Sequence, residues 1–336
     1  MKKMRTTILA AVVVLGLTGA GFAAARAGES PTPIASSLQW NLLRTAEGIL
    51  MDDPFKEAIP SREVQDSYEF NGDTEDARTF VRATAGGLEV GVNPDPLRQS
   101  HSGHFAVTHD AYPETSIFHV RMSKQPGQVK SADEVGQAVF AVQTASTKIT
   151  GLINFIVLSA DSTEGMTSWR VGYMYGHVRD AEYIGYWGTE PSVNEPDTQD
   201  ITLRTNGHNT LTVWFGEKEV FHSDDLDMDI GAPYQPYLEV QAVRTPFYSS
   251  FQDFWIVEND TIRLSGAPAG AHVALVADGV TLSEETATPG GEANLTLPPY
   301  AAKGSGTLEI TEPGREPVRL GSFDYAGGDQ LQLAVK

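Results

Sequence analysis

An acidic run at residues 224–229 is the first segment of the chain that could do chemistry. Carboxylates alternate within it at Asp225, Asp227 and Asp229. In an extended segment these three side chains would share one face. Carboxylate oxygens are the ligands that Ca²⁺ prefers, so the run predicts a Ca²⁺ site. A Gly-Ala-Pro sequence follows directly, so a solvated acidic loop is the alternative.

Two other polar segments have weaker patterns. Oxygen ligands at Asn194, Glu195, Asp197 and Asp200 could also hold Ca²⁺, but they lack the spacing of an EF-hand, so we interpret them as a solvated loop. Four histidines also gather in a short stretch without an HExxH or cysteine pattern. We interpret these as polar surface histidines: His101, His104, His109 and His119.

Aromatic residues are concentrated in a predicted hairpin, in the segments Trp169–Tyr175 and Tyr183–Trp187. Sugar sites use flat aromatic faces for stacking and a few placed polar groups for hydroxyls. The sequence therefore predicts a ligand-binding face on a concave sheet, although ordinary core packing is the alternative for each ring. The predicted binding residues are Arg121, Arg170, Trp187, Trp214, Glu239 and Gln241.

The elements that position these residues are predicted to be β-strands. From Tyr68 onward the apolar period is two, and turn residues such as Asn206-Gly207 separate short runs rich in Val, Ile, Thr and aromatics. A dozen such runs predict an all-β, antiparallel two-sheet jelly-roll sandwich over residues 66–258. The clearest runs are residues 79–84, 88–92, 104–108, 116–122, 136–144, 152–159, 168–175, 182–187, 201–205, 210–215, 238–244 and 251–257.

One helix is predicted before this domain, at about Ser37–Met51. Its apolar residues fall near helical spacing, Ser36 and Gln39 form a capping-box pattern, and Asp53-Pro54 ends it. With the Gly, Ser and Pro-rich residues before it, the helix makes up a lead-in at residues 28–65.

The composition changes after residue 258. Residues 261–336 are rich in Ala, Gly, Thr and Leu, and short strands recur in them. A segment of about 75 residues with this rhythm predicts a small immunoglobulin-like β-sandwich.

Residues 1–27 have the pattern of a secretory signal peptide: a basic start, a short apolar centre and an Ala-Arg-Ala end. They carry four cations and no acid, so their removal changes the formal net charge from −20 to −24. Such a charge repels nucleic acid and anionic membranes. We expect an exported protein with no membrane span after cleavage. The chain has no cysteine, so disulfides are excluded.

Residues 66–257 resemble a concanavalin A-like lectin/glucanase jelly roll. The likeness rests on an opening strand Ser67–Gly72, a late hairpin Asn209–Phe221 and a closing strand Ser250–Ile256 that is similar to that of laminin G-like members. This resemblance implies sugar binding, sugar hydrolysis or protein adhesion. Glucanases of this fold carry a Glu-x-Asp-x-x-Glu strand, from which the all-Asp run at 224–229 departs, so no catalytic residue is assigned.

These patterns favour a secreted, non-catalytic binding protein that recognises a glycan or a cell-surface partner. A secreted glycoside hydrolase or polysaccharide lyase on the same fold is one alternative. A structural envelope or appendage subunit is another. Paired carboxylates beside an aromatic platform would favour the enzyme, and flat outer sheet faces would favour the structural role.

Overall fold

The computed structural model describes residues 32–36, 40–53, 68–72, 79–84, 86–92, 102–108, 112–124, 129, 131, 134–144, 151–161, 167–177, 183–187, 192–193, 196–206, 210–224 and 234–335. Strands dominate these residues, and a single 3₁₀ turn, η1 (Pro299–Ala301), is their one helical element. The all-β class is therefore confirmed. None of the described helical structure is long and apolar enough to cross a membrane.

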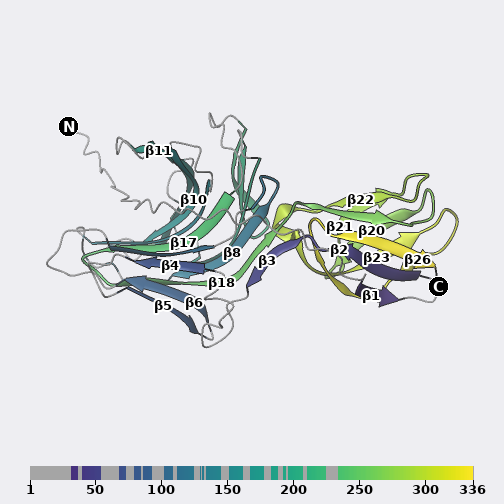
Figure 1. The fold of residues 1–336 in the computed structure, drawn as a ribbon, viewed down its shortest axis with the longest axis horizontal. Helices are drawn as coiled ribbons and strands as arrows, with labels where there is room; N and C mark the ends of the chain where they lie inside the picture. The colour runs from purple at the N-terminus through teal and green to yellow at the C-terminus, as the bar shows by residue number, and fades with distance from the viewer. Residues whose placement is uncertain are drawn as a thin grey trace.

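One sheet of the first sandwich, which we call the β17 sheet, is antiparallel, and some of its neighbouring strands are far apart in the sequence. Figure 1 shows β10 and β11 bending upward beside β17. In spatial order it contains β12 (Tyr183–Trp187), β11 (Thr167–His177), β10 (Gly151–Asp161), β9 (Val135–Thr144), β17 (Tyr234–Val243), β7 (Ser102–Thr108) and β4 (Tyr68–Gly72), with β13 (Ser192–Val193) on β11.

The second sheet, here the β18 sheet, packs below it in Figure 1. The chain crosses between the two sheets several times, as from β8 to β9 and from β17 to β18, which is typical of a jelly roll. In order it contains β16 (Lys218–Ser223), β15 (Leu211–Phe215), β14 (Thr198–Thr205), β8 (Ile117–Lys124), β18 (Phe247–Val257), β6 (Gly87–Val92) and β5 (Thr79–Thr84), with β3 (Ile49–Asp53) on β18.

The core of the first sandwich lies between these sheets and is built from alternating residues of each strand. Phe140 and Val142 of β9 face Phe251 and Phe254 of β18, and all four are buried. The parity of β18 changes at a bulge between Gln252 and Trp255, where Asp253 has a φ of 47°. Because of this bulge Trp255 is not part of the central core and packs in a separate cluster.

A second sandwich has its own core, centred on Leu275, Leu308 and Leu331. One of its sheets, here the β26 sheet, has the order β1 (Thr32–Ser36), β2 (Trp40–Ala46), β26 (Gln330–Val335), β19 (Thr261–Ser265) and β22 (Ala293–Thr296). The other, here the β23 sheet, has the order β21 (Val280–Thr286), β20 (His272–Ala277), β23 (Lys303–Thr311) and β24 (Val318–Arg319), with β25 (Phe323–Ala326) on β23.

The predicted helix at Ser37–Met51 is wrong. Residues 40–46 form β2, which pairs with β26 through Leu42 and Leu333, and residues 49–53 form β3 in the first sandwich. Apolar spacing alone does not separate a helix from a strand here, and pairing with β26 outweighs local propensity. Gly48 lies where the helix was expected, and a Cβ there would stand 2.1 Å from the carbonyl oxygen of Gly327.

The expected lead-in at 28–65 therefore contributes structure to both sandwiches. β1 and β2 complete the β26 sheet, and β3 then joins the β18 sheet, so the chain described here both starts and ends in the second sandwich. Figure 1 shows β3 between the two sandwiches. The signal-peptide prediction concerns residues outside the described ones.

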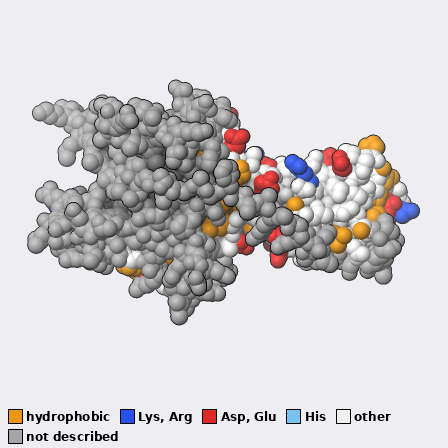
Figure 2. All heavy atoms as spheres, viewed as in Figure 1, with side chains coloured by type: hydrophobic (Ala, Val, Ile, Leu, Met, Phe, Trp, Pro, Cys, Tyr) orange, Lys and Arg blue, Asp and Glu red, His pale blue; other side chains and the backbone are white. Residues whose placement is uncertain are grey.

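The two sandwiches meet at a small apolar cluster flanked by ion pairs. Ile117, Trp255 and Val257 of the first contact Ala302 and Ala326 of the second. Two ion pairs lie at the same junction: Arg204 Nη1 to Asp260 Oδ2 at 2.6 Å and Lys303 Nζ to Asp52 Oδ1 at 2.8 Å. Acidic side chains gather around this region in Figure 2.

Candidate functional site

The outer face of the β17 sheet carries a row of polar side chains. On β9, Ala138 and Phe140 face the core, so Gln137 and Val139 face outward. On β17, Leu238 and Val240 face the core in the same way, which places the two residues that follow them outward. The cross-strand pairs on this face are Val139 with Glu239 and Gln137 with Gln241.

Three of these side chains form a hydrogen-bonded chain that we call the polar ladder: Gln137, Gln241 and Glu239. The Nε2 of Gln137 donates to Oε1 of Gln241 at 2.5 Å. The Nε2 of Gln241 donates in turn to Oε1 of Glu239 at 2.5 Å. Each amide is only 5% exposed, so the network is held in one arrangement and leaves the Glu239 carboxyl at its end.

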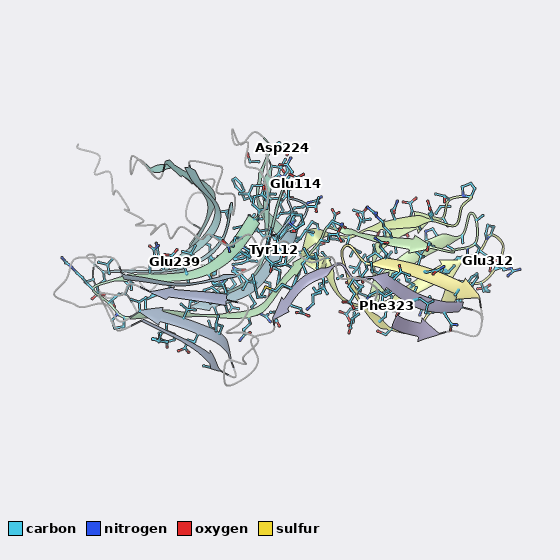
Figure 3. The ribbon with its side chains drawn as sticks, in the orientation of Figure 1. Tyr112, Glu114, Asp224, Glu239, Glu312 and Phe323 are labelled. Carbon is cyan, nitrogen blue, oxygen red and sulfur yellow. The ribbon has the colours of Figure 1, made fainter. Side chains whose placement is uncertain are left out.

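Burial raises the pKa of Glu239 from 4.5 to about 7, although the hydrogen bond from Gln241 acts in the opposite direction. The cross-strand neighbour of Glu239 is the apolar Val139, which is 3% exposed and gives no compensating charge. A carboxyl in such surroundings is protonated in a large share of molecules near neutral pH. It can then donate a proton as well as accept a hydrogen bond. Figure 3 shows Glu239 standing on β17 in the first sandwich.

Two further predicted binding positions lie on the same sheet. Residue 170 of β11 is in register with residue 158 of β10, which pairs with Val139. Residue 187 of β12 pairs with Gly172, two positions further along β11. Only the backbone is described at Arg170 and Trp187. By register, four of the six predicted positions therefore share this face with the polar ladder.

The other two predicted binding residues do not join them. Arg121 and Trp214 belong to the β18 sheet, so the six predicted residues do not lie on one sheet. The Nη2 of Arg121 lies 3.2 Å from Oδ2 of Asp200. Trp214 is 9% exposed and pairs with Thr202 on the outer face of its sheet. Strand alternation gives the parity of a residue but not the sheet to which its strand belongs, and this caused the error.

One predicted surface histidine is buried. His119 is 8% exposed, stacks on Trp255 with ring centroids 4.5 Å apart, and shares a 2.9 Å hydrogen bond with Thr202 through Nδ1. Burial, followed by the charges of Lys303 and Arg121, lowers the pKa of His119 to about 3. The ring is therefore neutral and structural at the junction. His101 and His109 lie outside the described residues, and at His104 only the backbone is described.

The predicted metal ligands Asp225, Asp227 and Asp229 lie outside the described residues, so the Ca²⁺ prediction stays a prediction. Asp224, just before them, has Oδ1 3.0 Å from Nε2 of His222. Figure 3 shows Asp224 well separated from Glu239. Within the described part of the chain, no group of three or more acidic or histidine side chains could hold a metal ion.

Gln137 is the ladder residue that the sequence did not single out. Its signal was a polar residue within the apolar β9 segment, two positions before the buried Val139. From the sequence alone, such a glutamine is interpreted as a solvent-exposed position. Its role depends on the pairing of β9 with β17, which are about 90 residues apart in the sequence.

No protein-family model matches the chain, and no curated protein matches it significantly. Solved structures with a similar arrangement include one described under endo-acting O-glycanases of the human gut microbiota that initiate mucin breakdown, at 13% identity, covering 63% of this chain and all of that chain, with a TM-score of 0.45. A putative β-glucanase from Mycobacterium abscessus is 10% identical, with 62% and 100% covered and a TM-score of 0.43. A β-1,3-glucanase from Mycobacterium marinum is 9% identical, with 63% and 100% covered and a TM-score of 0.41. These activities are those of the proteins named and assign none to this chain.

Proposed function

We propose that the chain binds a glycan on the outer face of the β17 sheet and that the polar ladder is the centre of this site. The single observation that carries the proposal is the chain of hydrogen bonds from Gln137 through Gln241 to Glu239. Planar amide and carboxyl groups in a fixed row match the paired hydroxyls of a sugar ring. The partly exposed Glu239 at the end of this row offers its carboxyl to a sugar hydroxyl.

Binding to a glycan array, followed by titration calorimetry with the best oligosaccharide, tests this proposal. Gln241→Leu keeps the volume but breaks both hydrogen bonds, and we expect it to weaken binding at least tenfold. Arg121→Gln, on the opposite sheet, is the matched control and should change the affinity less than twofold. Unchanged binding by Gln241→Leu in a folded variant would place the glycan site elsewhere.

A second candidate function is glycoside hydrolysis, and the raised pKa of Glu239 favours it. A general acid must be protonated at working pH so that it can protonate the glycosidic oxygen as the bond breaks. A glycosidase also needs a second carboxyl group, about 5 Å away for retention or 6.5–9.5 Å for inversion. In this reading Glu239 is the acid, and the second carboxylate is not assigned.

A hydrolysis assay separates the two functions. Release of reducing ends from the bound oligosaccharide, lost in Glu239→Gln while binding persists, would support the enzyme. If the wild-type protein binds the oligosaccharide but releases no reducing ends, the result supports a non-catalytic binding protein. Gln137→Leu is a useful companion variant, because it disturbs the ladder without removing the carboxyl.

We also propose that the protein is exported and processed near Gly28, so that the site acts on extracellular glycans. The basic start and the apolar stretch of residues 1–27 support this proposal. N-terminal sequencing of the protein recovered from the culture medium should begin near Gly28. Recovery of a chain that still begins at Met1 would contradict it.

A further inference from the structure

A pocket of about 530 Å³ lies on the second sandwich, at the outer face of the β23 sheet. On β23, Leu308 and Ile310 face the core, so Thr307 and Glu309 face outward and line the pocket. Neighbouring strands contribute Val276, Thr281 and Arg319. The pocket is therefore built by residues of β20, β21, β23 and β24, at positions that alternate with the core.

Two of its charged groups form an ion pair. The Nη2 of Arg319 lies 2.8 Å from Oε1 of Glu309, which is only 22% exposed. At the rim, Asp278 and Gly279 form the two-residue turn between β20 and β21, with φ angles of 49° and 80°. Positive φ at both central residues is typical of a type I′ hairpin turn, which is tight and fixes the backbone of Asp278 at the rim.

The floor of the pocket is partly backbone. A Cβ at Gly306 would stand 3.0 Å from the carbonyl oxygen of Val276 and 3.2 Å from the ring of Tyr325. The absence of a side chain at Gly306 therefore lets β23 pack tightly against β20 and β25. Val276 beside it is half-buried and apolar. Val276 is the one apolar side chain of the lining, and the other lining residues are polar, charged or glycine.

We infer that this pocket is a second carbohydrate site, which binds one pyranose ring of an oligosaccharide through at least two free hydroxyls. The carboxylates of Asp278 and Glu309 accept hydrogen bonds from sugar hydroxyls, and the Arg319 guanidinium donates hydrogen bonds to the oxygens of such hydroxyls. The hydroxyls of Thr281 and Thr307 can do either. The volume lies within the range of about 300–1,000 Å³ that is typical of small-molecule sites.

The inference takes its ligand class from the proposed function, but it concerns different residues on a different sandwich. Two sites on one chain would bind a polysaccharide at two points. Once the first site is occupied, the effective concentration of the same polysaccharide at the second site rises. The overall affinity can then exceed that of either single site by about 10²–10⁴-fold. The second sandwich would then be a binding module rather than a spacer.

Titration calorimetry of the full chain tests the inference, with trisaccharides of glucose, galactose, mannose and N-acetylglucosamine as separate probes. Thr281→Trp fills the pocket from the exposed edge strand β21. Asp278→Asn removes a carboxylate while keeping a residue type that tolerates the turn. We expect each to weaken binding of at least one trisaccharide tenfold or more. Thr286→Trp, exposed on the same strand but outside the pocket, is the control and should have no effect.

The outcomes separate this inference from the proposed function. Loss of binding only in the pocket variants would support the second site and count against the polar ladder. Loss only in Gln241→Leu would overturn the second site and leave the proposed function standing. If all variants melt as the wild type does and no trisaccharide binds to any of them, the second site is overturned as well.

Discussion

The backbone N–H of Gly48 donates a 2.9 Å hydrogen bond to Oδ1 of Asp329, 281 positions later in the chain. The other carboxylate oxygen accepts from the N–H of Ala326 at 3.0 Å and lies 3.2 Å from Nη2 of Arg44. Gly48 also accepts a hydrogen bond from the N–H of Glu258. Residues 44–48 and 326–329 therefore meet at one carboxylate, which is 1% exposed, and the Gly48 carbonyl links them to Glu258 beside the junction of the two sandwiches.

Replacing Asp329 with alanine should destabilise the second sandwich strongly. The substitution leaves two buried N–H groups without their acceptor and removes one partner of the Arg44 guanidinium, which keeps Glu47 and the carbonyl of Asp324. Breaking a buried ion pair in this way costs about 3–5 kcal/mol. Chemical denaturation monitored by circular dichroism measures the loss. Glu285→Ala, exposed on β21, should change the free energy of unfolding by less than about 0.5 kcal/mol. Equal effects of the two substitutions would contradict the structural role of Asp329.

Leu42 and Leu50 should respond very differently to truncation. In the expected helix both would lie on or near one apolar stripe, whereas in the structure Leu42 is fully buried and Leu50 is 39% exposed. Leu42→Ala should cost about 2–5 kcal/mol of the free energy of unfolding, because it leaves a cavity in the core. Leu50→Ala should cost less than about 0.5 kcal/mol. Comparable losses would favour the helix over β2 and β3.

Stability should depend on pH through Glu239. The pKa of this carboxyl is about 7 in the folded protein, above the ordinary value of 4.5, so the folded state holds its proton more tightly than the unfolded state. Ionisation therefore costs stability as pH rises from about 4.5 to 7, and the full stability is present below that window. Melting temperatures of wild type and Glu239→Gln, measured from pH 4.5 to 8, should diverge with the wild type falling. Parallel curves would show that the pKa is not raised.

Ca²⁺ should raise the melting temperature if Asp225, Asp227 and Asp229 form a site. A ligand that binds only the native state stabilises it by about 2.7 kcal/mol at a hundredfold excess over its dissociation constant. Asp225→Asn combined with Asp227→Asn should abolish the shift. The pair Asp197→Asn and Asp200→Asn should leave it, because Asp200 is already engaged by Arg121. Identical melting temperatures in millimolar Ca²⁺ and in chelator would contradict the predicted Ca²⁺ site.

Most strands were predictable because their evidence is local. The runs at 79–84 and 136–144 are rich in Val, Thr and Phe and lie within a residue of β5 and β9. Two of the three residues of the polar ladder were also found, since Glu239 and Gln241 are charged and polar positions between buried neighbours. Gln137 was missed because its importance comes from a partner on another strand. The helix was predicted wrongly because residues 37–51 carry no information about β26, the strand with which β2 pairs.

Local sequence was enough to predict the all-β class, the parity of most strands and the outward position of Glu239, because alternation is a property of each strand alone. The tertiary structure decided which strands are neighbours. It separated Arg121 and Trp214 from the other predicted binding residues, buried His119 against Trp255, and placed residues 32–36 and 40–46 in the C-terminal sandwich. The physical reason is that pairing between strands depends on backbone hydrogen bonds and buried area shared by segments far apart in the chain. No short window of sequence contains both partners.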